Sequence, residues 1–600
     1  MFHWNNWFQQ SMLGSEKNMN RTHHNGELRI THENETVELL GWVSKRRNFG
    51  SIVFIDLRDR TGIVQLVINQ EQFPEVEKVR SEYILNVKGT VIERQDKNPK
   101  LRTGDIEIDV TEFEIINAAK QTPMIIADET DALEDTRMKY RYLDLRRPIM
   151  QNRLMTRAKI TSNMRNTLES MGFIDIETPM LTKSTPEGAR EYLVPSRVHP
   201  GEFYALAQSP QIFKQLLMIG GLERYYQIAR CFRDEDLRAD RQLDFTQVDI
   251  EASFLTQDQF MGIVETVATN VMVDVLGEAK PEFPRIKFVD AMNIYGSDKP
   301  DLRFEMHLND FNETFKNSEF QVFSNTIAAN GSLKGLILRG NHSEKFTRKV
   351  MDKYTDLVKK HGLNGLVVLK YENDVFSGSA AKFISEDEKH TIVNEHKLVH
   401  GDVLFIGSGA WEVCANAIGS LRLQLAKDFD LIAENAFKYA WVVDFPMFEA
   451  DEEGNLVARH HPFTAPKATD IPLLDTNPLE VIAEAYDLVL NGFEIAGGSM
   501  RIYQQALQEK MFELIGFTPE QIQSRFGFFV DAFQYGTPPH GGIAFGLDRF
   551  AMALTHSNSI RDVIAFPKNA SARDPLTQAP AKATQQQLDD LHLLIEYPEK

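Results

Sequence analysis

Arginine, glutamate and aromatic side chains fall on the expected faces of two neighbouring strands in an arrangement suited to a nucleotide. Alternation in ERYYQIARCFRDE puts Arg233 and Glu235 on one face of the first strand. Alternation in DFTQVDIEASF puts Phe245, Gln247 and Asp249 on one face of the second. An arginine offers a planar fork for an α-phosphate, and a phenylalanine ring offers a plane for a purine. We interpret this face as a ligand floor; a face of ion pairs packed under a helix is the alternative.

A later segment, GGIAFGLDRFAMALT, favours close approach of a phosphate or a ring to the backbone. Small residues lead into an expected helix, and Arg549 falls within its first turn. Glycine-rich helix entries are common, so this segment is informative only together with the two strands.

Two carboxylates are expected to meet in EAYDLVLNGFEIAGGSMR. Asn491-Gly492 between apolar strands predicts a hairpin with a type I′ turn. That turn would set Val489 opposite Glu494 and Asp487 opposite Ala496, which makes the two acids diagonal neighbours on one face. Such a pair can share Mg²⁺ together with phosphate oxygens. The alternative is a pair of solvated surface acids.

Two cationic side chains, Lys214 in QSPQIFKQLL and Arg501 in GGSMRIY, are candidates for binding a small acid. Such a pocket needs cations for a carboxylate and acceptors for an ammonium group, desolvated enough to reject the amide analogue. The alternative for Lys214 is a helix lysine whose ammonium reaches into water. His460 and His461 could be metal ligands, but they lack a third ligand at helical spacing, so we expect no histidine metal centre.

The segment SIVFIDLRDRTGIVQLVI predicts a hairpin with an apolar inner face and an outward face that can read RNA. Phe54 and Gln65 face outward, and a turn centred on Asp59 and Arg60 would set them opposite each other. With Arg47 just upstream, they offer stacking, hydrogen bonds and phosphate attraction to an unstacked base. A surface phenylalanine covered by another domain is the alternative. The inner face comprises Val53, Ile55, Leu57, Val64, Leu66 and Ile68.

Composition excludes several classes of protein. A net charge of −20 argues against a chain that coats nucleic acid nonspecifically, so any RNA contact must come from local basic patches. The two cysteines, Cys231 and Cys414, are far apart, which argues against a disulfide framework and suits a reducing cytoplasm. No run approaches 18 consecutive apolar residues, so we expect no membrane span.

The length of 600 residues suggests about four domain-sized units. Five short strands before residue 126 predict a small β-barrel, and a block with its own strands interrupts a larger mixed domain. The expected parts are an N-terminal extension (1–18), the barrel (19–126), a hinge (127–149), a first catalytic part (150–302), an inserted α+β domain (303–433), and a second catalytic part with a C-terminal extension (434–600).

Together these segments resemble the class II aminoacyl-tRNA synthetases. Phe232-Arg233-Asp234-Glu235 matches the motif 2 signature, and Gly546-Leu547-Asp548-Arg549 matches that of motif 3. The barrel resembles the anticodon-binding OB-fold of class IIb, which implies that Arg47, Phe54 and Gln65 contact the anticodon. The resemblance implies an α/β multidomain chain with an antiparallel-sheet catalytic domain. Motif 1, which builds a homodimer interface in the family, resembles the stretch with Ile160, Met164, Leu168 and Met171.

Nearly the whole chain from about residue 19 resembles the aspartyl branch of this family in its bacterial form. The segments TPEGAREYLVP, ALAQSPQIFKQLL, RHHPFTAP and GFEIAGGSMRIY carry this likeness, although Tyr503 stands where the family often has histidine. The implied reaction is ATP-dependent activation of L-aspartate and its transfer to tRNA(Asp), with tRNA(Asn) an open second acceptor. The barrel loop KRRNFG carries Phe49 at a position relevant to that choice.

The resemblance also implies roles for individual residues. Lys214 and Arg501 would bind the side-chain carboxylate of aspartate, and Arg233, Glu494 and Arg549 would be catalytic. Asp487 and Glu494 would hold Mg²⁺. Other implied aspartate contacts are Glu187, Ser209, Gln211, Arg233, Gln247, Asp249, His460 and His461. Implied ATP contacts are Arg233, Asp234, Glu235, Gln242, Phe245, Glu494, Gly546, Leu547, Asp548 and Arg549.

Two other functions fit part of the pattern. An amide ligase could make asparagine from the adenylate and ammonia on the same fold, but the complete RNA-facing barrel argues against it. A noncatalytic RNA-binding paralogue is disfavoured by intact Arg233, Glu494 and Arg501.

Overall fold

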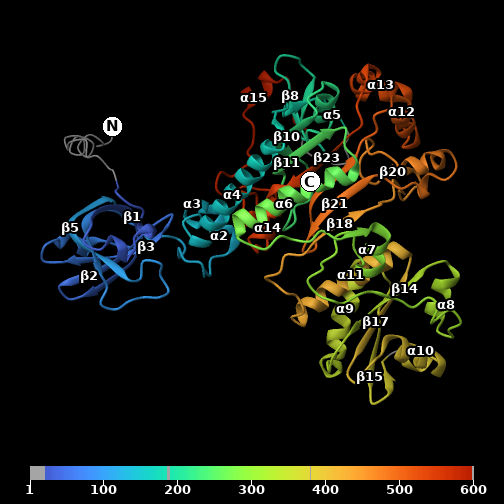
Figure 1. The fold of residues 1–600 in the computed structure, drawn as a ribbon, viewed down its shortest axis with the longest axis horizontal. Coiled ribbons are helices and arrows are strands. Elements are labelled where there is room, and N and C mark those ends of the chain that lie inside the picture. The colour runs from blue at the N-terminus through green and yellow to red at the C-terminus, as the bar shows by residue number, and fades with distance from the viewer. Residues whose placement is uncertain (1–20, 186–189, 379, 597–600) are drawn as a thin grey trace. The chain divides into compact units, whose positions relative to one another are not determined.

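The structure is a computed structural model that describes residues 21–185, 190–378 and 380–596 (Figure 1). The predicted extension 1–18 and the predicted contact Glu187 therefore lie outside the described residues. The chain divides into two compact units. The first holds residues up to 154 with 565–569 and 573–580, and the second holds the remainder. The domain borders expected from the sequence stay predictions.

The first unit contains a closed five-stranded barrel, as predicted. Its strands are β1 (Thr36–Phe49), β2 (Ile52–Asp59), β3 (Gly62–Asn69), β4 (Ile84–Glu93) and β5 (Ile106–Asn117), in the order β1-β2-β3-β5-β4. The six predicted inner-face residues of β2 and β3 are all fully buried. Period-2 alternation therefore identified the barrel core correctly.

The predicted pairing of Phe54 with Gln65 is wrong. Phe54 lies opposite Val67, and Gln65 lies opposite Asp56, because the turn is centred one residue later, on Arg60 and Thr61. The Asp59 carboxylate accepts hydrogen bonds from the Thr61 amide at 2.8 Å and the Thr61 hydroxyl at 2.7 Å, which stabilises this later turn. Phe54 and Gln65 become diagonal neighbours on the same outward face.

The predicted hinge carries two short helices, α2 (Glu134–Lys139) and α3 (Arg141–Asp144), within the first unit. Asp144 is fully buried and pairs with Arg137, Arg141 and Arg147 at 2.7–3.0 Å. Burial alone would raise the pKa of Asp144, but these guanidinium groups lower it. These short helices are accompanied by ion pairs, and the sequence of this segment shows no apolar periodicity.

The second unit is built on an eight-stranded sheet in the order β12-β18-β21-β22-β23-β11-β10-β6 (Figure 1). Neighbouring strands are antiparallel, except for the parallel pairs β10–β6 and β12–β18 at its two ends. The strands are β6 (Ile174–Asp175), β10 (Arg224–Phe232), β11 (Asp244–Ser253), β12 (Arg285–Lys287), β18 (Tyr439–Val443), β21 (Ala485–Leu490), β22 (Phe493–Met500) and β23 (His540–Gly546).

Helices cover one face of this sheet with apolar side chains. In α4 (Pro148–Ser170) the predicted stripe Ile160, Met164 and Leu168 is fully buried in the same cluster as sheet residues Ile250 and Phe545. The cluster also takes residues from α6 (Gln257–Asn270) and α14 (Leu547–Leu554). On the other face, Val442 of β18 and Val489 of β21 belong to a second apolar cluster, whereas β11 presents polar side chains such as Asp249 and Glu251.

One segment, Gln257–Leu276, is long and apolar enough to pass a simple test for a membrane span. In the structure Phe260, Val264 and Val267 on this segment are fully buried in the apolar cluster, and Glu265 accepts a hydrogen bond from the Trp441 indole at 3.0 Å. These contacts identify it as a core helix of the domain.

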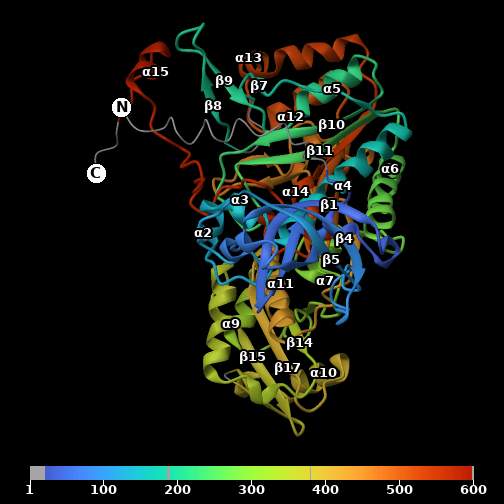
Figure 2. The ribbon, with the colours of Figure 1, turned by 90° about the vertical axis from the view of Figure 1, so that its left-hand side faces the viewer.

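A second sheet takes all its strands from residues 309–409, inside the interval predicted for the inserted domain (Figure 2). Its order is β13-β14-β17-β15-β16. One buried cluster joins α9 and α11 to this sheet, and another joins α8 and α10 to it. The elements are β13 (Asn309–Asp310), α8 (Gln321–Ala328), β14 (Ser332–Leu338), α9 (Arg348–Lys360), β15 (Val367–Glu372), β16 (Val375–Ser377), α10 (Glu386–His396), β17 (Val403–Gly409) and α11 (Trp411–Asp428).

Candidate active site

Lys214 and Arg501 meet at one buried carboxylate, Glu251. The Lys214 ammonium lies 3.3 Å from Glu251 Oε2 and donates a hydrogen bond to Asp249 Oδ1 at 2.7 Å. Arg501 reaches the same Glu251 through Nε at 3.0 Å and Nη2 at 3.1 Å. Both cations are only 2% exposed. The structure therefore brings together the two cations that the sequence analysis paired.

Three elements position this cluster. Lys214 lies in the first turn of α5 (Gln211–Ile219), and Arg501 follows the end of β22. Asp249 and Glu251 are two residues apart on β11, so both side chains leave the strand on one face. Sequence reasoning missed Glu251. The alternation that selected Gln247 and Asp249 extends to it, and this was the available signal.

The charges in the cluster are unequally compensated. Burial favours protonation of Glu251, but Arg501 and Lys214 outweigh it and lower the pKa of Glu251. Burial raises the pKa of Asp249 despite the contact with Lys214. Asp249 Oδ2 is buried and has no hydrogen-bond partner among the described residues. A buried acceptor left without a donor suits a ligand that carries an ammonium group.

The two histidines lie beside this cluster as neutral groups. Arg501 Nη1 donates to His461 Nε2 at 2.8 Å, which requires an unprotonated nitrogen there. Burial and Arg501 hold the pKa of His461 well below its usual value, and burial lowers the pKa of His460 to about 4. Within the described ranges no cluster of three or more His, Cys, Asp or Glu side chains could hold a metal. The expectation of no histidine metal centre stays a prediction.

The other predicted aspartate contacts surround α5 and β11. The Ser209 hydroxyl accepts a hydrogen bond from the Gln211 amide at 3.3 Å, at the start of the helix. Gln211 Nε2 is buried and has no partner among the residues that the structure describes. Gln247 lies on β11 and accepts a hydrogen bond from the Cys231 thiol at 3.3 Å. Their contacts with a ligand stay predictions.

Arg233, directly after β10, lies beside Phe245 of the neighbouring strand β11. The Arg233 guanidinium is 5.1 Å from the centre of the Phe245 ring, and Arg233 Nε is buried with no partner in the described part of the chain. Arg549 donates through Nη1 to the Glu494 carbonyl at 2.7 Å. Glu235 Oε2 pairs with Arg241 at 3.0 Å, and its predicted contact with adenine stays a prediction.

The motif 3 residues connect α14 to β11 and to the apolar cluster under the sheet. Asp548 is 3% exposed; it accepts a hydrogen bond from the Thr246 amide at 2.8 Å and pairs with Arg157. Leu547 lies in the apolar cluster under the sheet. These contacts fix the start of α14 against β11, so that Arg549 faces the Glu494 backbone. Gly546 pairs with Gln247, and Gln242 is buried before β11.

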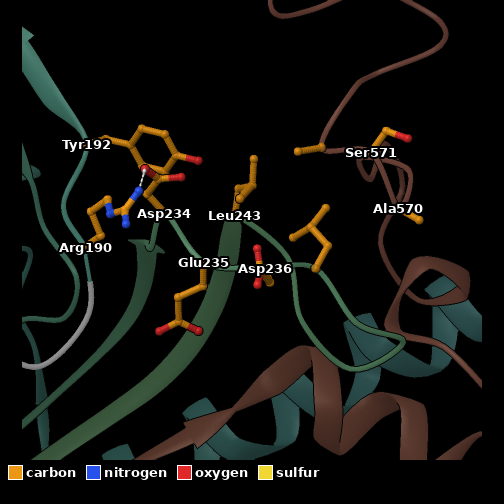
Figure 3. Close-up of a pocket in the computed structure, with 10 residues that line it drawn as sticks. Arg190, Tyr192, Asp234, Glu235, Asp236, Leu243, Ala570 and Ser571 are labelled. Atoms are coloured by element: carbon orange, nitrogen blue, oxygen red, sulfur yellow. Dashed lines mark ion pairs between the residues drawn. The ribbon is translucent and has the colours of Figure 1, made fainter.

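A cavity of about 500 Å³ opens at the end of β10 and is lined by two of the predicted ATP contacts, Asp234 and Glu235 (Figure 3). Arg190 and Tyr192 lie on one side of it, and Ala570 and Ser571 lie on the other. The Lys214–Arg501 cluster does not line this cavity.

The Asp487–Glu494 hairpin forms with one change of register. Asn491 and Gly492 have φ values of 53° and 84°, as a type I′ turn requires, and Val489 lies opposite Glu494 as predicted. An irregularity after Leu488 places Asp487 opposite Gly497 and not Ala496, so that prediction is wrong. The two carboxylates still converge. A Cβ built on Gly497 would lie 2.9 Å from Asp487 Oδ1 and 3.2 Å from Glu494 Oε1.

The outward face of the barrel gathers the three predicted anticodon contacts. Arg47 lies opposite Phe54 in β1–β2, and its Nη2 donates to Gln65 Oε1 at 2.9 Å and to Asp56 at 2.7 Å. Phe49 is 68% exposed and meets the edge of Phe54 with ring centres 5.7 Å apart. Phe49 thus gives this face exposed aromatic surface. Gln65, predicted to face outward, is only 6% exposed: its oxygen also accepts from Arg94 at 2.9 Å, and its amide nitrogen donates to Glu107 at 2.7 Å.

Comparison with known families decides the identity of the chain at the family level. Residues 133–570 match the model of tRNA synthetases class II (D, K and N), and residues 37–116 match that of the OB-fold nucleic acid binding domain. The chain belongs to the class II tRNA synthetases. The segments named motifs 2 and 3 above fall within the first match, and the barrel falls within the second.

Similar proteins cover almost the whole synthetase. A protein from Bacillus thuringiensis (strain Al Hakam) named aspartate--tRNA(Asp/Asn) ligase is 52% identical over 588 residues, 97% of this chain and 99% of that protein. One of the same name from Bacillus cereus (strain AH820) gives the same values.

Solved structures share the fold. Aspartyl tRNA synthetase from Entamoeba histolytica matches with a TM-score of 0.57 at 17% identity and covers 93% of this chain and 94% of its own. Asparaginyl-tRNA synthetase from Pyrococcus horikoshii, complexed with asparaginyl-adenylate, matches with a TM-score of 0.56 at 18% identity and covers 90% of this chain and 96% of its own.

The environment of His460 predicts a ring that stays neutral in mildly acidic solution. A histidine with a pKa near 4 takes up its proton only well below the usual value of about 6.5. In the full-length chain with isotope-labelled histidine, the His460 NMR signal should not move between about pH 8 and about pH 5.5. His460→Gln assigns the signal, and the exposed His199 provides a reference. A midpoint near 6.5 for His460 would contradict this placement.

Proposed function

We propose that the synthetase uses ATP to activate L-aspartate as its adenylate and transfers the aspartyl group to tRNA(Asp) and tRNA(Asn). The single observation that carries this proposal is the convergence of Lys214 and Arg501 on one buried carboxylate. The printed name of the Bacillus relatives, with both tRNAs, supports the choice of amino acid and acceptor.

The buried cation pair accounts for selection of aspartate over asparagine. A second carboxylate entering beside Glu251 would complete the charge balance of Lys214 and Arg501, whereas an amide would leave them undercompensated. The free Asp249 oxygen is available for the ammonium end of the ligand. His461, neutral and bonded to Arg501, adds no positive charge and fixes the guanidinium plane.

The carboxylates of Asp487 and Glu494 fit Mg²⁺ that is bound together with ATP. Two carboxylates converge on a glycine that leaves room between them, and Mg²⁺ takes one or two protein carboxylates together with phosphate oxygens and water. Burial and the nearby Glu494 raise the pKa of Asp487, as expected for two neighbouring carboxylates. When bound, Mg²⁺ would neutralise charge on the phosphates.

The protein's part in the reaction is positioning and electrostatics. In our proposal Arg233, with a free Nε beside Phe245, holds the α-phosphate while the aspartate α-carboxylate attacks the α-phosphorus in line. The bond from that phosphorus to the bridging oxygen of the β-phosphate breaks, and pyrophosphate leaves. Arg549, fixed by the Glu494 carbonyl, supports the nucleotide from α14. The terminal adenosine hydroxyl of tRNA then attacks the adenylate. No side chain acts as a nucleophile.

The remaining parts of the proposal concern partners. The barrel face with Arg47, Phe54 and Gln65 would stack and bind anticodon bases. The family resemblance of the α4 segment supports a homodimer, and the two separate free cysteines suit a reducing cytoplasm. An ammonia-dependent asparagine-forming ligase is the second candidate, and the complete OB-fold match argues against it.

Charging assays test the function directly. Purified tRNA(Asp) and tRNA(Asn) should each accept labelled aspartate in the presence of ATP, and Arg501→Met should raise the aspartate KM of aspartate-dependent pyrophosphate exchange by at least about 30-fold, because a buried charge pair is broken. The ATP KM should change little.

Arg285→Met, which breaks an exposed pair with Asp258, is the matched control and should behave as the parent. Thermal melting verifies that each variant folds. Release of asparagine from aspartate and ammonia without tRNA would instead establish the amide ligase. If no aspartyl-tRNA forms, the proposed function is refuted.

Phe54→Ala should weaken tRNA use without affecting activation. Loss of one stacking surface costs about 1–3 kcal/mol per base, so the tRNA KM should rise about five- to 150-fold. Pyrophosphate exchange, which needs no tRNA, should be unchanged. Phe383→Ala removes an exposed ring outside the barrel and should leave both assays unaffected. An unchanged tRNA KM in Phe54→Ala would remove this residue from the RNA interface.

Gly497→Ala should impair the use of magnesium. The added Cβ would occupy the space between Asp487 and Glu494 and displace their oxygens. The Mg²⁺ concentration for half-maximal pyrophosphate exchange should rise about ten- to a hundredfold, the range found when the support of metal ligands is disturbed. Gly262→Ala adds a Cβ in open space on α6 and is the control. A normal magnesium requirement in Gly497→Ala would place the metal elsewhere.

A further inference from the structure

A lysine that the sequence analysis did not select lies beside the carboxylate pair. Lys299 Nζ is 3.1 Å from Glu494 Oε2 and 4.0 Å from Asp298 Oδ2. The Lys299 ammonium therefore occupies the neighbourhood that a metal ion would share with Glu494.

The backbone around Lys299 is packed against the hairpin that carries these carboxylates. Lys299 lies in the segment 297–303, which follows α7 (Phe288–Tyr295). A Cβ built on Gly492, in the hairpin turn, would lie 3.3 Å from Asp301 Cβ, so Asp301 sits directly on the turn. Arg303 holds the Asp301 carboxylate through Nε at 2.9 Å and Nη2 at 2.6 Å. This segment cannot shift without disturbing the hairpin.

The inserted domain holds the other side of the segment. Arg422 of α11 is 1% exposed and donates through Nη2 to the carbonyls of Asp301 at 3.0 Å and Phe304 at 3.1 Å, and through Nε to that of Met306. Its guanidinium lies 3.9 Å from the centre of the Phe304 ring. A buried arginine that binds three carbonyls fixes the path of the chain just beyond Lys299.

We propose that Lys299 is a positioning residue that serves as a built-in cation at the Asp487–Glu494 pair. It holds Glu494 in place before a divalent cation arrives and competes with that cation for the same carboxylate. The inference rests on the proposed function, in which this pair binds Mg²⁺. Competition follows because a divalent cation and an ammonium group cannot both occupy the near side of Glu494 Oε2, and because two positive charges at this spacing repel.

Replacing the ammonium with a neutral group of similar length should tighten metal binding. Lys299→Met removes one positive charge near the metal position, and Coulomb's law at the dielectric of water gives about a thirtyfold gain in affinity for a divalent cation about 4 Å away. Lys299→Arg keeps the charge and should bind metal within about threefold of the parent. Lys353→Met, which breaks an ammonium–carboxylate pair with Asp428 of similar length, should not change metal binding.

The measurement is a titration of the nucleotide-free, full-length protein with Mn²⁺, followed by electron paramagnetic resonance of the free ion. Glu494→Gln is the reference for the metal site and should weaken Mn²⁺ binding. If Glu494→Gln has no effect, the pair is not the metal site and the proposed function fails at that point. If Glu494→Gln weakens binding but Lys299→Met leaves it unchanged or weaker, the inference about Lys299 alone is overturned.

A parallel measurement separates this role from direct contact with the nucleotide. If Lys299→Met raises the ATP KM in pyrophosphate exchange while Mn²⁺ affinity stays at the parent value, Lys299 binds phosphate and the built-in cation is refuted. The expected pattern is tighter Mn²⁺ binding together with a lower Mg²⁺ requirement.

Discussion

The site depends on a buried carboxylate that two cations share. Removing Lys214 and Arg501 from water is costly unless their charge is compensated, and Glu251, fully buried between them, supplies much of that compensation. Its presence allows the cations to remain charged and fixed before a ligand binds. In the proposed function a substrate carboxylate meets preorganised donors, whereas a neutral amide brings no charge to compensate the two cations. The proposal thus derives selectivity and structural integrity from one charge arrangement.

The same principle recurs at the nucleotide end of the site. Asp487 and Glu494 lie close together beside Gly497, and burial with the nearby Glu494 raises the pKa of Asp487. Lys299 and Arg549 lower the pKa of Glu494 against the effect of burial. At one end of the site Lys214 and Arg501 are paired with a buried carboxylate. At the other end the carboxylate Glu494 lies beside the cations Lys299 and Arg549. Each end is stable without its ligand, yet each leaves atoms free for one.

Alternation and turn chemistry predicted the faces of strands better than their pairing. The core of the barrel hairpin and the Asn491-Gly492 turn came directly from side-chain period and from glycine preference, both local properties. The pairings of Phe54 and Asp487 were displaced by local events: hydrogen bonds to Asp59 moved one turn, and an irregularity after Leu488 shifted the other strand. Glu251 was within reach of the same alternation rule. Lys299 was not, because only long-range packing brings segment 297–303 to the hairpin.

That packing ties the inserted domain to the chemistry. Helix α7 ends at Gly296, and a Cβ there would lie 2.3 Å from the Ala415 carbonyl, while a Cβ on Gly419 would lie 2.1 Å from the Gly296 carbonyl. Backbone therefore meets backbone between the C-terminal end of α7 and the first half of α11. Arg422 of α11 binds the Asp301 carbonyl in the same segment that carries Lys299, so the inserted domain is joined by a buried contact to the chain beside the Asp487–Glu494 pair.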